Sequence, residues 1–199
     1  ASSTIGATTA AEYLKAVNVT STANTATLAG NVFATTVTAT ATDTTDSDSI
    51  AFGGSVTGDT LTLVGTGTFK FDDVVTTAVD ANLIDGAKII LTKGIASGDT
   101  VFAATQAATA LAGASVGAVV VTMPETLNTG SINFIDYVGA TTGAADAALL
   151  TVGNSKLATY AAAIGSDSTI AKITATAKSA ATIASELSIT TDQANALYN

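Results

Sequence analysis

The chain contains no cysteine, histidine, tryptophan or arginine, and only one proline. Without cysteine it forms no disulfide and offers no thiolate to zinc or to an iron–sulfur cluster. Its seven basic residues are all lysine and stand against 16 acidic residues, for a net charge of −9. Nucleic-acid binding needs clustered lysine and arginine, so this balance argues against it, as it does against binding to an anionic membrane surface. No apolar run has the length of a membrane span.

The absence of histidine decides how the one catalytic pattern in the chain is interpreted. Gly113-Ala114-Ser115-Val116-Gly117 matches G-x-S-x-G, the nucleophile elbow of serine hydrolases. An elbow serine follows a strand and precedes a helix, whereas periodicity predicts a helix before Ser115 and a strand after it. No histidine takes the serine proton, and no S-x-x-K sequence offers a lysine instead. We therefore predict that Ser115 lies in a turn and that the protein is not an enzyme.

What the chain has in abundance is threonine, 38 of its 199 residues. Threonine and valine are β-branched and suit the half-buried surface of a sheet. Strands are predicted at 31–42, 60–71 and 116–123, with apolar and polar positions alternating most regularly in 60–71. Asp85-Gly86 is predicted to be a hairpin turn. No repeat of fixed period is visible, which argues against a solenoid.

Alanine-rich segments with helical spacing predict helices, mostly late in the chain. The predicted helices cover 10–17, 100–112, 144–150, 156–164 and 169–187, with a last short one through Tyr198 that Thr190 or Thr191 caps. The expected fold class is α+β and mainly β: an antiparallel β-sandwich-like domain with alanine-rich helices toward the C-terminus. The expected division is a β-rich domain at 1–139, with its short N-terminal helix, and a helical segment at 140–199 packed on it, or one single domain.

Two acidic clusters are candidate Ca²⁺ sites, because Ca²⁺ prefers several carboxylate oxygens from one loop. The candidate ligands are Asp43, Asp46 and Asp48, and more weakly Asp72 and Asp73, with Asp80 and Asp85 as neighbours. The sequence does not fit an EF-hand loop. The alternative is that these aspartates cap backbone amides in solvated turns. A glycosidase pair is disfavoured, because sugar sites usually present aromatic platforms and this chain has few aromatic residues.

Threonine also recurs at alternate positions, most clearly at Thr36, Thr38, Thr40 and Thr42 and again at Thr60 and Thr62. A flat threonine ladder resembles the ice-binding face of some antifreeze proteins, although those arrays recur once per solenoid coil. The alternative is that threonine fills the wet face of ordinary strands. Threonines are also acceptors for O-glycans, and Asn18-Val19-Thr20 is an N-glycosylation sequon.

In composition the whole chain resembles secreted structural proteins of prokaryotic surfaces, such as S-layer and extracellular filament subunits. The shared features are abundant threonine, alanine and glycine, few lysines, no arginine, acidity and no cysteine. The resemblance implies an extracellular, cell-surface protein whose partner is itself. Copies would form a filament or lattice by strand exchange and Ca²⁺-bridged contacts, with residues 1–30 as a donor or edge. The alternative function is a secreted adhesin or an ice- or glycan-binding module that uses a threonine-rich face.

Overall fold

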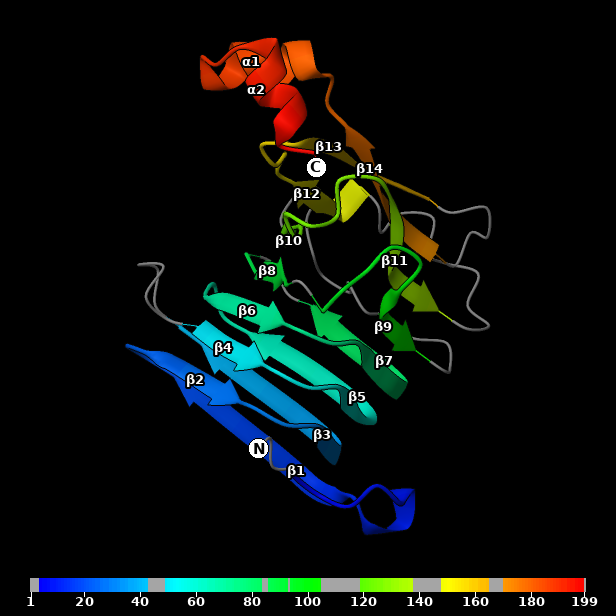
Figure 1. Ribbon diagram of the computed structural model, residues 1–199. Helices are drawn as coiled ribbons and strands as arrows, with labels where there is room; N and C mark the ends of the chain where they lie inside the picture. Colours follow the sequence, from blue (N-terminus) through cyan, green and yellow to red (C-terminus); the bar gives the residue numbers. More distant parts are fainter. Residues whose placement is uncertain are drawn as a thin grey trace.

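The fold is known from a computed structural model of the chain (Figure 1). The structure describes residues 4–42, 49–83, 86–92, 94–104, 119–137, 148–164 and 170–198. Within these ranges it contains two β-sheets and two short α-helices. Sheet A has eight strands in the order β1-β3-β5-β7-β9-β11-β14-β13, and sheet B has six in the order β12-β10-β8-β6-β4-β2.

The strands of sheet A are β1 (Leu14–Ser21), β3 (Val32–Ala41), β5 (Val56–Val64), β7 (Val75–Leu83), β9 (Thr100–Ala104), β11 (Gly130–Tyr137), β13 (Ala158–Ile164) and β14 (Ile170–Ala177). The strands of sheet B are β2 (Thr25–Leu28), β4 (Ser49–Phe52), β6 (Thr68–Phe71), β8 (Lys88–Leu91), β10 (Val119–Thr122) and β12 (Leu150–Val152). The helices are a 3₁₀ turn η1 (Ala10–Glu12), α1 (Ala180–Leu187) and α2 (Thr191–Ala196).

The chain alternates between the two sheets, so that each pair of consecutive strands makes one coil of a solenoid. From β1 to β11 in sheet A, and throughout sheet B, every neighbouring pair is parallel. Parallel neighbours need a long connection, and here the strand in the opposite sheet is that connection. In Figure 1 the coils stack from the blue N-terminal strands toward the red helices. The predicted antiparallel sandwich is therefore wrong: alternation identifies the buried face of a strand but not the direction of its neighbour.

The coils differ in length, which explains why no fixed period is visible in the sequence. Leu14 pairs with Ala34, Val32 with Val56, and Val56 with Val75, which are offsets of 20, 24 and 19 residues. The offset grows to 33 where Thr100 pairs with Asn133. The prediction against a solenoid is wrong for this reason: lengthening a turn shifts the period without changing the register of the strands.

The inner faces of the two sheets form one core of small aliphatic residues and phenylalanines. The predicted alternation of 60–71 is correct in its faces, since Leu61, Leu63, Phe69 and Phe71 are all buried. The segment is not one continuous strand, however, because Gly65 has a φ of +95° and turns the chain from β5 in sheet A to β6 in sheet B. A Cβ on Gly65 would also lie 2.2 Å from the Ala41 carbonyl oxygen of the preceding coil.

The Asp85-Gly86 turn likewise joins two sheets rather than two hairpin strands. Gly86 has a φ of +82°, and β7 and β8 on either side of it belong to sheets A and B. Asp85 lies outside the described residues. The predicted strand 31–42 is confirmed as β3, and the described end of 116–123 is β10.

Several predicted helices are strands. The 10–17 segment is η1 followed by the start of β1, and the described part of 100–112 is β9. The alanine-rich 156–164 segment contains β13, and the first half of 169–187 is β14; these two strands form an antiparallel hairpin, and β14 pairs antiparallel with β11. Pairing with neighbouring strands outweighs the helical preference of alanine here. Helix α2 is confirmed at the C-terminus, with Thr190 and Gln193 forming a capping box.

Candidate functional site

The structure describes only part of the predicted chemistry. Ser115 and the acidic cluster Asp43, Asp46 and Asp48 lie outside the described residues. Asp80 lies in β7, where the structure does not describe its side chain. The predictions for these residues stay predictions.

Asp72 and Asp73 lie in the turn between β6 and β7, and both stabilise turns. Asp72 accepts hydrogen bonds from the Thr92 hydroxyl and, at 3.3 Å, from the Gly94 amide, and so joins its turn to the next coil. Asp73 Oδ1 accepts from the Val74 amide at 2.8 Å. These hydrogen bonds match the alternative given above for the two aspartates, in which they cap backbone amides in turns rather than bind Ca²⁺. Among the described residues, no three carboxylates come together in a group able to hold a metal ion.

The outer face of sheet A carries an ordered array of threonines. Thr36 pairs with Thr60, and Thr38 pairs with Thr62, on the parallel strands β3 and β5. All four are half-buried and lie on the face opposite the core. Parallel strands lie about 4.8 Å apart and alternate residues of one strand about 6.6 Å apart, so these side chains form a regular two-dimensional grid. The objection that threonine arrays need a solenoid is therefore removed by the fold.

The array continues onto β1. On β1, Asn18 and Thr20 pair with Thr38 and Thr40. Asn18, the sequon residue, is exposed on this strand. On the other side the backbone of β7 pairs Asp80 with Thr60 and Asn82 with Thr62, and the structure does not describe these two β7 side chains.

The N-terminal end of the solenoid is open. Among the described strands, β1 is hydrogen-bonded only to β3 and β2 only to β4, so both sheets end in edge strands at the same end of the molecule (Figure 1). Four inward-facing apolar residues of these strands pack on the core but remain partly exposed: Val17, Val19, Ala26 and Leu28. Solenoids usually close such an end with a polar cap.

The opposite end also finishes in edge strands, β13 in sheet A and β12 in sheet B, but a hairpin and two helices pack there, and we call it the closed end. The β13–β14 hairpin covers the last coil, and the buried Tyr160 hydroxyl donates to the Leu127 carbonyl oxygen at 2.9 Å. Beyond it α1 and α2 pack on one another and bury Ile183 and Ala194. The Tyr198 hydroxyl ties the helices to the hairpin at the carbonyl oxygens of Leu157 and Lys178.

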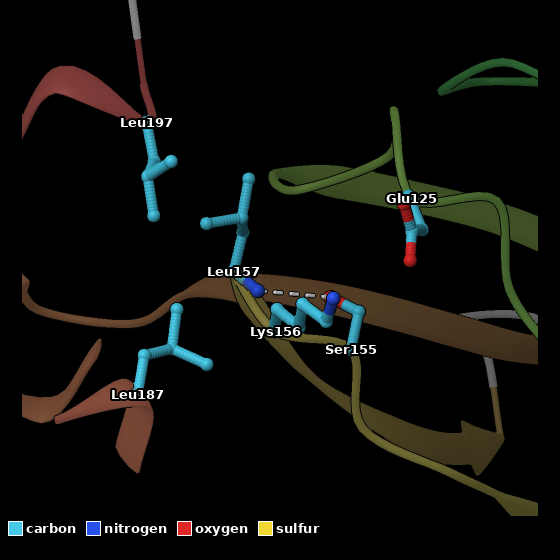
Figure 2. A pocket seen from close by; sticks show the side chains of 6 residues that line it. All are labelled: Glu125, Ser155, Lys156, Leu157, Leu187 and Leu197. Carbon is cyan, nitrogen blue, oxygen red and sulfur yellow. Dashed lines mark hydrogen bonds between the residues drawn. The ribbon is translucent and has the colours of Figure 1, made fainter. Parts of the chain in front are cut away.

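A pocket of about 250 Å³ lies in this closed end, between the helices and the segment that precedes β13 (Figure 2). Three leucines line it, at 157, 187 and 197, with Glu125 and Lys156 to one side. The Ser155 hydroxyl accepts hydrogen bonds from the amides of Leu157 and Ala158, at 3.3 and 3.0 Å, and so it holds the turn. The lining of this pocket is therefore mainly apolar, and its one hydroxyl, on Ser155, is engaged by backbone amides.

Comparison of the chain with models of protein families, with curated proteins and with solved structures finds no match. Neither described helix exceeds eight residues, so neither has the length to cross a membrane.

Sequence reasoning missed the register that builds the threonine array and the open end. The sequence does contain a signal of the strand register: Gly30-Asn31-Val32 recurs 24 residues later as Gly54-Ser55-Val56. The two turns stack directly, because the Ser55 amide donates to Asn31 Oδ1 at 3.1 Å. A search for similar turns at unequal spacing would have found it.

Proposed function

We propose that the protein is an extracellular structural subunit whose copies associate through the open end formed by β1 and β2. The observation that supports this most directly is that the edge strands β1 and β2 and four partly exposed core residues lie together at one end. The edge strands at the other end, β12 and β13, lie beside a hairpin and helices that are tied to them by hydrogen bonds. Unpaired strand edges readily accept another strand, and the apolar residues beside them gain burial when they do. The composition of the chain supports the extracellular, cell-surface setting.

Identical ends that meet are related by a twofold axis. When this axis is perpendicular to the sheets, β1 of one copy lies antiparallel to β1 of the second copy. Both sheets, and the core between them, then continue from one copy into the other. This contact yields pairs. A filament or lattice then needs a second contact on another surface, and the predicted Ca²⁺ bridge through Asp43, Asp46 and Asp48 is the one that we propose.

The test is the assembly state of the wild-type chain and of Val19→Lys over a wide concentration range, by analytical ultracentrifugation. Val19 faces inward at the open end, so a lysine there places a charge in the junction. Thr159→Lys is the matched control, since Thr159 is exposed on β13 at the closed end. We expect association of the wild type and of the control, and a folded monomer for Val19→Lys, with the circular dichroism of a β protein and a lower unfolding midpoint. A wild-type chain that stays monomeric at millimolar concentration contradicts the proposal.

The Ca²⁺ contact is tested separately by electron microscopy with and without a chelator. We expect Ca²⁺ to convert pairs into larger arrays, and Asp46→Asn to abolish that step while leaving the pairs intact. If the arrays form equally well with the chelator and in the Asp46→Asn variant, Ca²⁺ has no part in the assembly.

A second candidate function, binding to ice or to a glycan surface, is favoured by the in-register threonine array. Methyl and hydroxyl groups at two regular spacings suit a flat, periodic partner better than a single small molecule. Thr38→Lys places a long charged side chain in the centre of the array, and Thr174→Lys, at an exposed position on β14, is the control. Loss of ice-growth inhibition or of glycan retention in the first variant alone would support this function; no activity in the wild type would exclude it.

A further inference from the structure

The outer face of sheet B contains a hollow that is separate from the open end and from the threonine array. It has a volume of about 300 Å³ and is lined by side chains from β4, β6, β8 and β10: Ser49, Thr68, Lys70, Lys88, Ile90, Val120 and Thr122. Strand register arranges them in two rows. Ser49, Thr68, Lys88 and Val120 form one row, and Lys70, Ile90 and Thr122 form the other.

One hydroxyl in this hollow lacks a partner among the described residues. Thr68 is only 7% exposed, yet no hydrogen bond reaches its hydroxyl from any part of the chain that the structure describes. Ser49 beside it is 2% exposed, and its hydroxyl shares a hydrogen bond of 2.7 Å with Thr25 Oγ1. A buried hydroxyl without a partner is costly, so Thr68 marks a place where a ligand atom completes the structure.

A cation lies next to this hydroxyl. Lys70 follows Thr68 by two residues on β6, so both side chains point to the same outer face. Lys70 is half-buried and, within the described residues, forms no ion pair, whereas Lys178 binds Glu186 at 2.6 Å. Lys70 therefore offers a positive charge beside buried hydroxyls, without a carboxylate bound to it among the described residues.

We propose that this hollow binds a tetrahedral oxyanion, the phosphate or sulfate group of a small molecule or of a surface polymer. Such a group presents several acceptor oxygens at once, and the Lys70 ammonium and the hydroxyls of Thr68 and Ser49 are donors from neighbouring strands. The hollow is larger than a free ion, and its apolar side, made by Ile90 and Val120, leaves space for the carrier of the anion. The proposal is independent of self-association.

The test is a titration of the isotopically labelled protein, followed by amide chemical shifts, with inorganic phosphate, glycerol phosphate and glycerol. We expect saturable shifts on β4, β6 and β8 with both phosphates and none with glycerol. Lys70→Gln should weaken phosphate binding about tenfold or more, as expected for loss of a charge-assisted hydrogen bond. Lys172→Gln, which removes a half-buried lysine from the outer face of β14, should leave it unchanged.

Thr68→Val separates a binding role from a structural one. Valine removes the unpaired hydroxyl at nearly constant shape, so the ligand-free protein should unfold at the same or a higher temperature while its phosphate affinity falls. If glycerol phosphate binds more tightly than inorganic phosphate, the natural ligand is a phosphate group attached to a larger molecule. If the two bind equally, the ligand is the free ion. No saturable shifts, shifts equal to those with chloride, or phosphate affinity unchanged in both Lys70→Gln and Thr68→Val would overturn the proposal.

Discussion

Replacing Phe71 by alanine tests the claim that successive coils share one core. Phe71 is fully buried, and its ring is stacked at 4.9 Å on Phe52 of β4 and edge-on at 5.1 Å to Phe102 of β9. Phe102 in turn contacts Phe134 of β11 at 5.3 Å. These rings form a row that runs along the solenoid and joins strands of both sheets.

The expected loss in the free energy of unfolding follows from these contacts. Truncating a buried phenylalanine to alanine costs about 3–5 kcal/mol. Each aromatic contact contributes about 0.5–1.5 kcal/mol beyond burial, so the two lost ring contacts account for about 1–3 kcal/mol of that total. Phe71→Leu keeps most of the volume and loses mainly the ring contacts, so it should cost less than Phe71→Ala. Against a usual stability of about 5–15 kcal/mol, the alanine variant should remain folded but markedly weakened.

The assay is equilibrium urea unfolding followed by circular dichroism, with Phe33→Ala as the matched control. Phe33 is half-buried on the outer face of β3 and contacts only the Tyr13 ring, at 5.8 Å, among the described aromatic residues. We expect the midpoint to fall much further for Phe71→Ala than for Phe33→Ala. Equal losses in the two variants would refute the reasoning, because they would mean that Phe71 is no more deeply packed than an outer-face ring.

Three further changes test other parts of the fold. Gly58→Ala should destabilise the protein severely or prevent folding, because a Cβ there would lie 1.9 Å from the Ala34 carbonyl oxygen of the adjacent coil; soluble expression and thermal unfolding check this. Tyr160→Phe should lower the free energy of unfolding by about 1–3 kcal/mol, since it leaves a buried carbonyl without its donor; urea unfolding measures it. Thr190→Ala should cost about 1 kcal/mol or less of helix stability, because it removes the hydroxyl that accepts from the Gln193 amide; hydrogen exchange of α2 should rise while that of β3 stays unchanged.

The sequence predicts the faces of strands better than their partners. Leu61 and Phe69 are correctly placed in the core, because alternation depends only on which side of a strand is buried. Whether strands run parallel depends on turns such as the one at Gly65, whose positive φ no alternation pattern reveals. The same limit explains β13: alanine favours a helix locally, and only pairing with β14 makes 158–164 a strand.

The candidate sites show the same contrast between what one segment of sequence predicts and what only the pairing of distant segments decides. Asp72 was recognisable as a turn aspartate or a Ca²⁺ ligand, and only its bonds to Thr92 and Gly94 show the turn role. The hollow on sheet B combines Thr68 and Lys88, residues 20 positions apart in the sequence that register places side by side. A pattern search within short windows cannot find such a site.

The unequal length of the coils has a consequence for how this protein can change. Lys88 pairs with Thr68 across an offset of 20 residues and with Val120 across 32, yet both pairs are aligned in the same sheet. Residues can therefore be gained or lost where the chain crosses between layers, while the ladders on either side keep their alignment. Such crossings are the natural places to insert a tag, a protease site or a new recognition loop, and a lineage could vary its surface there while conserving the scaffold beneath.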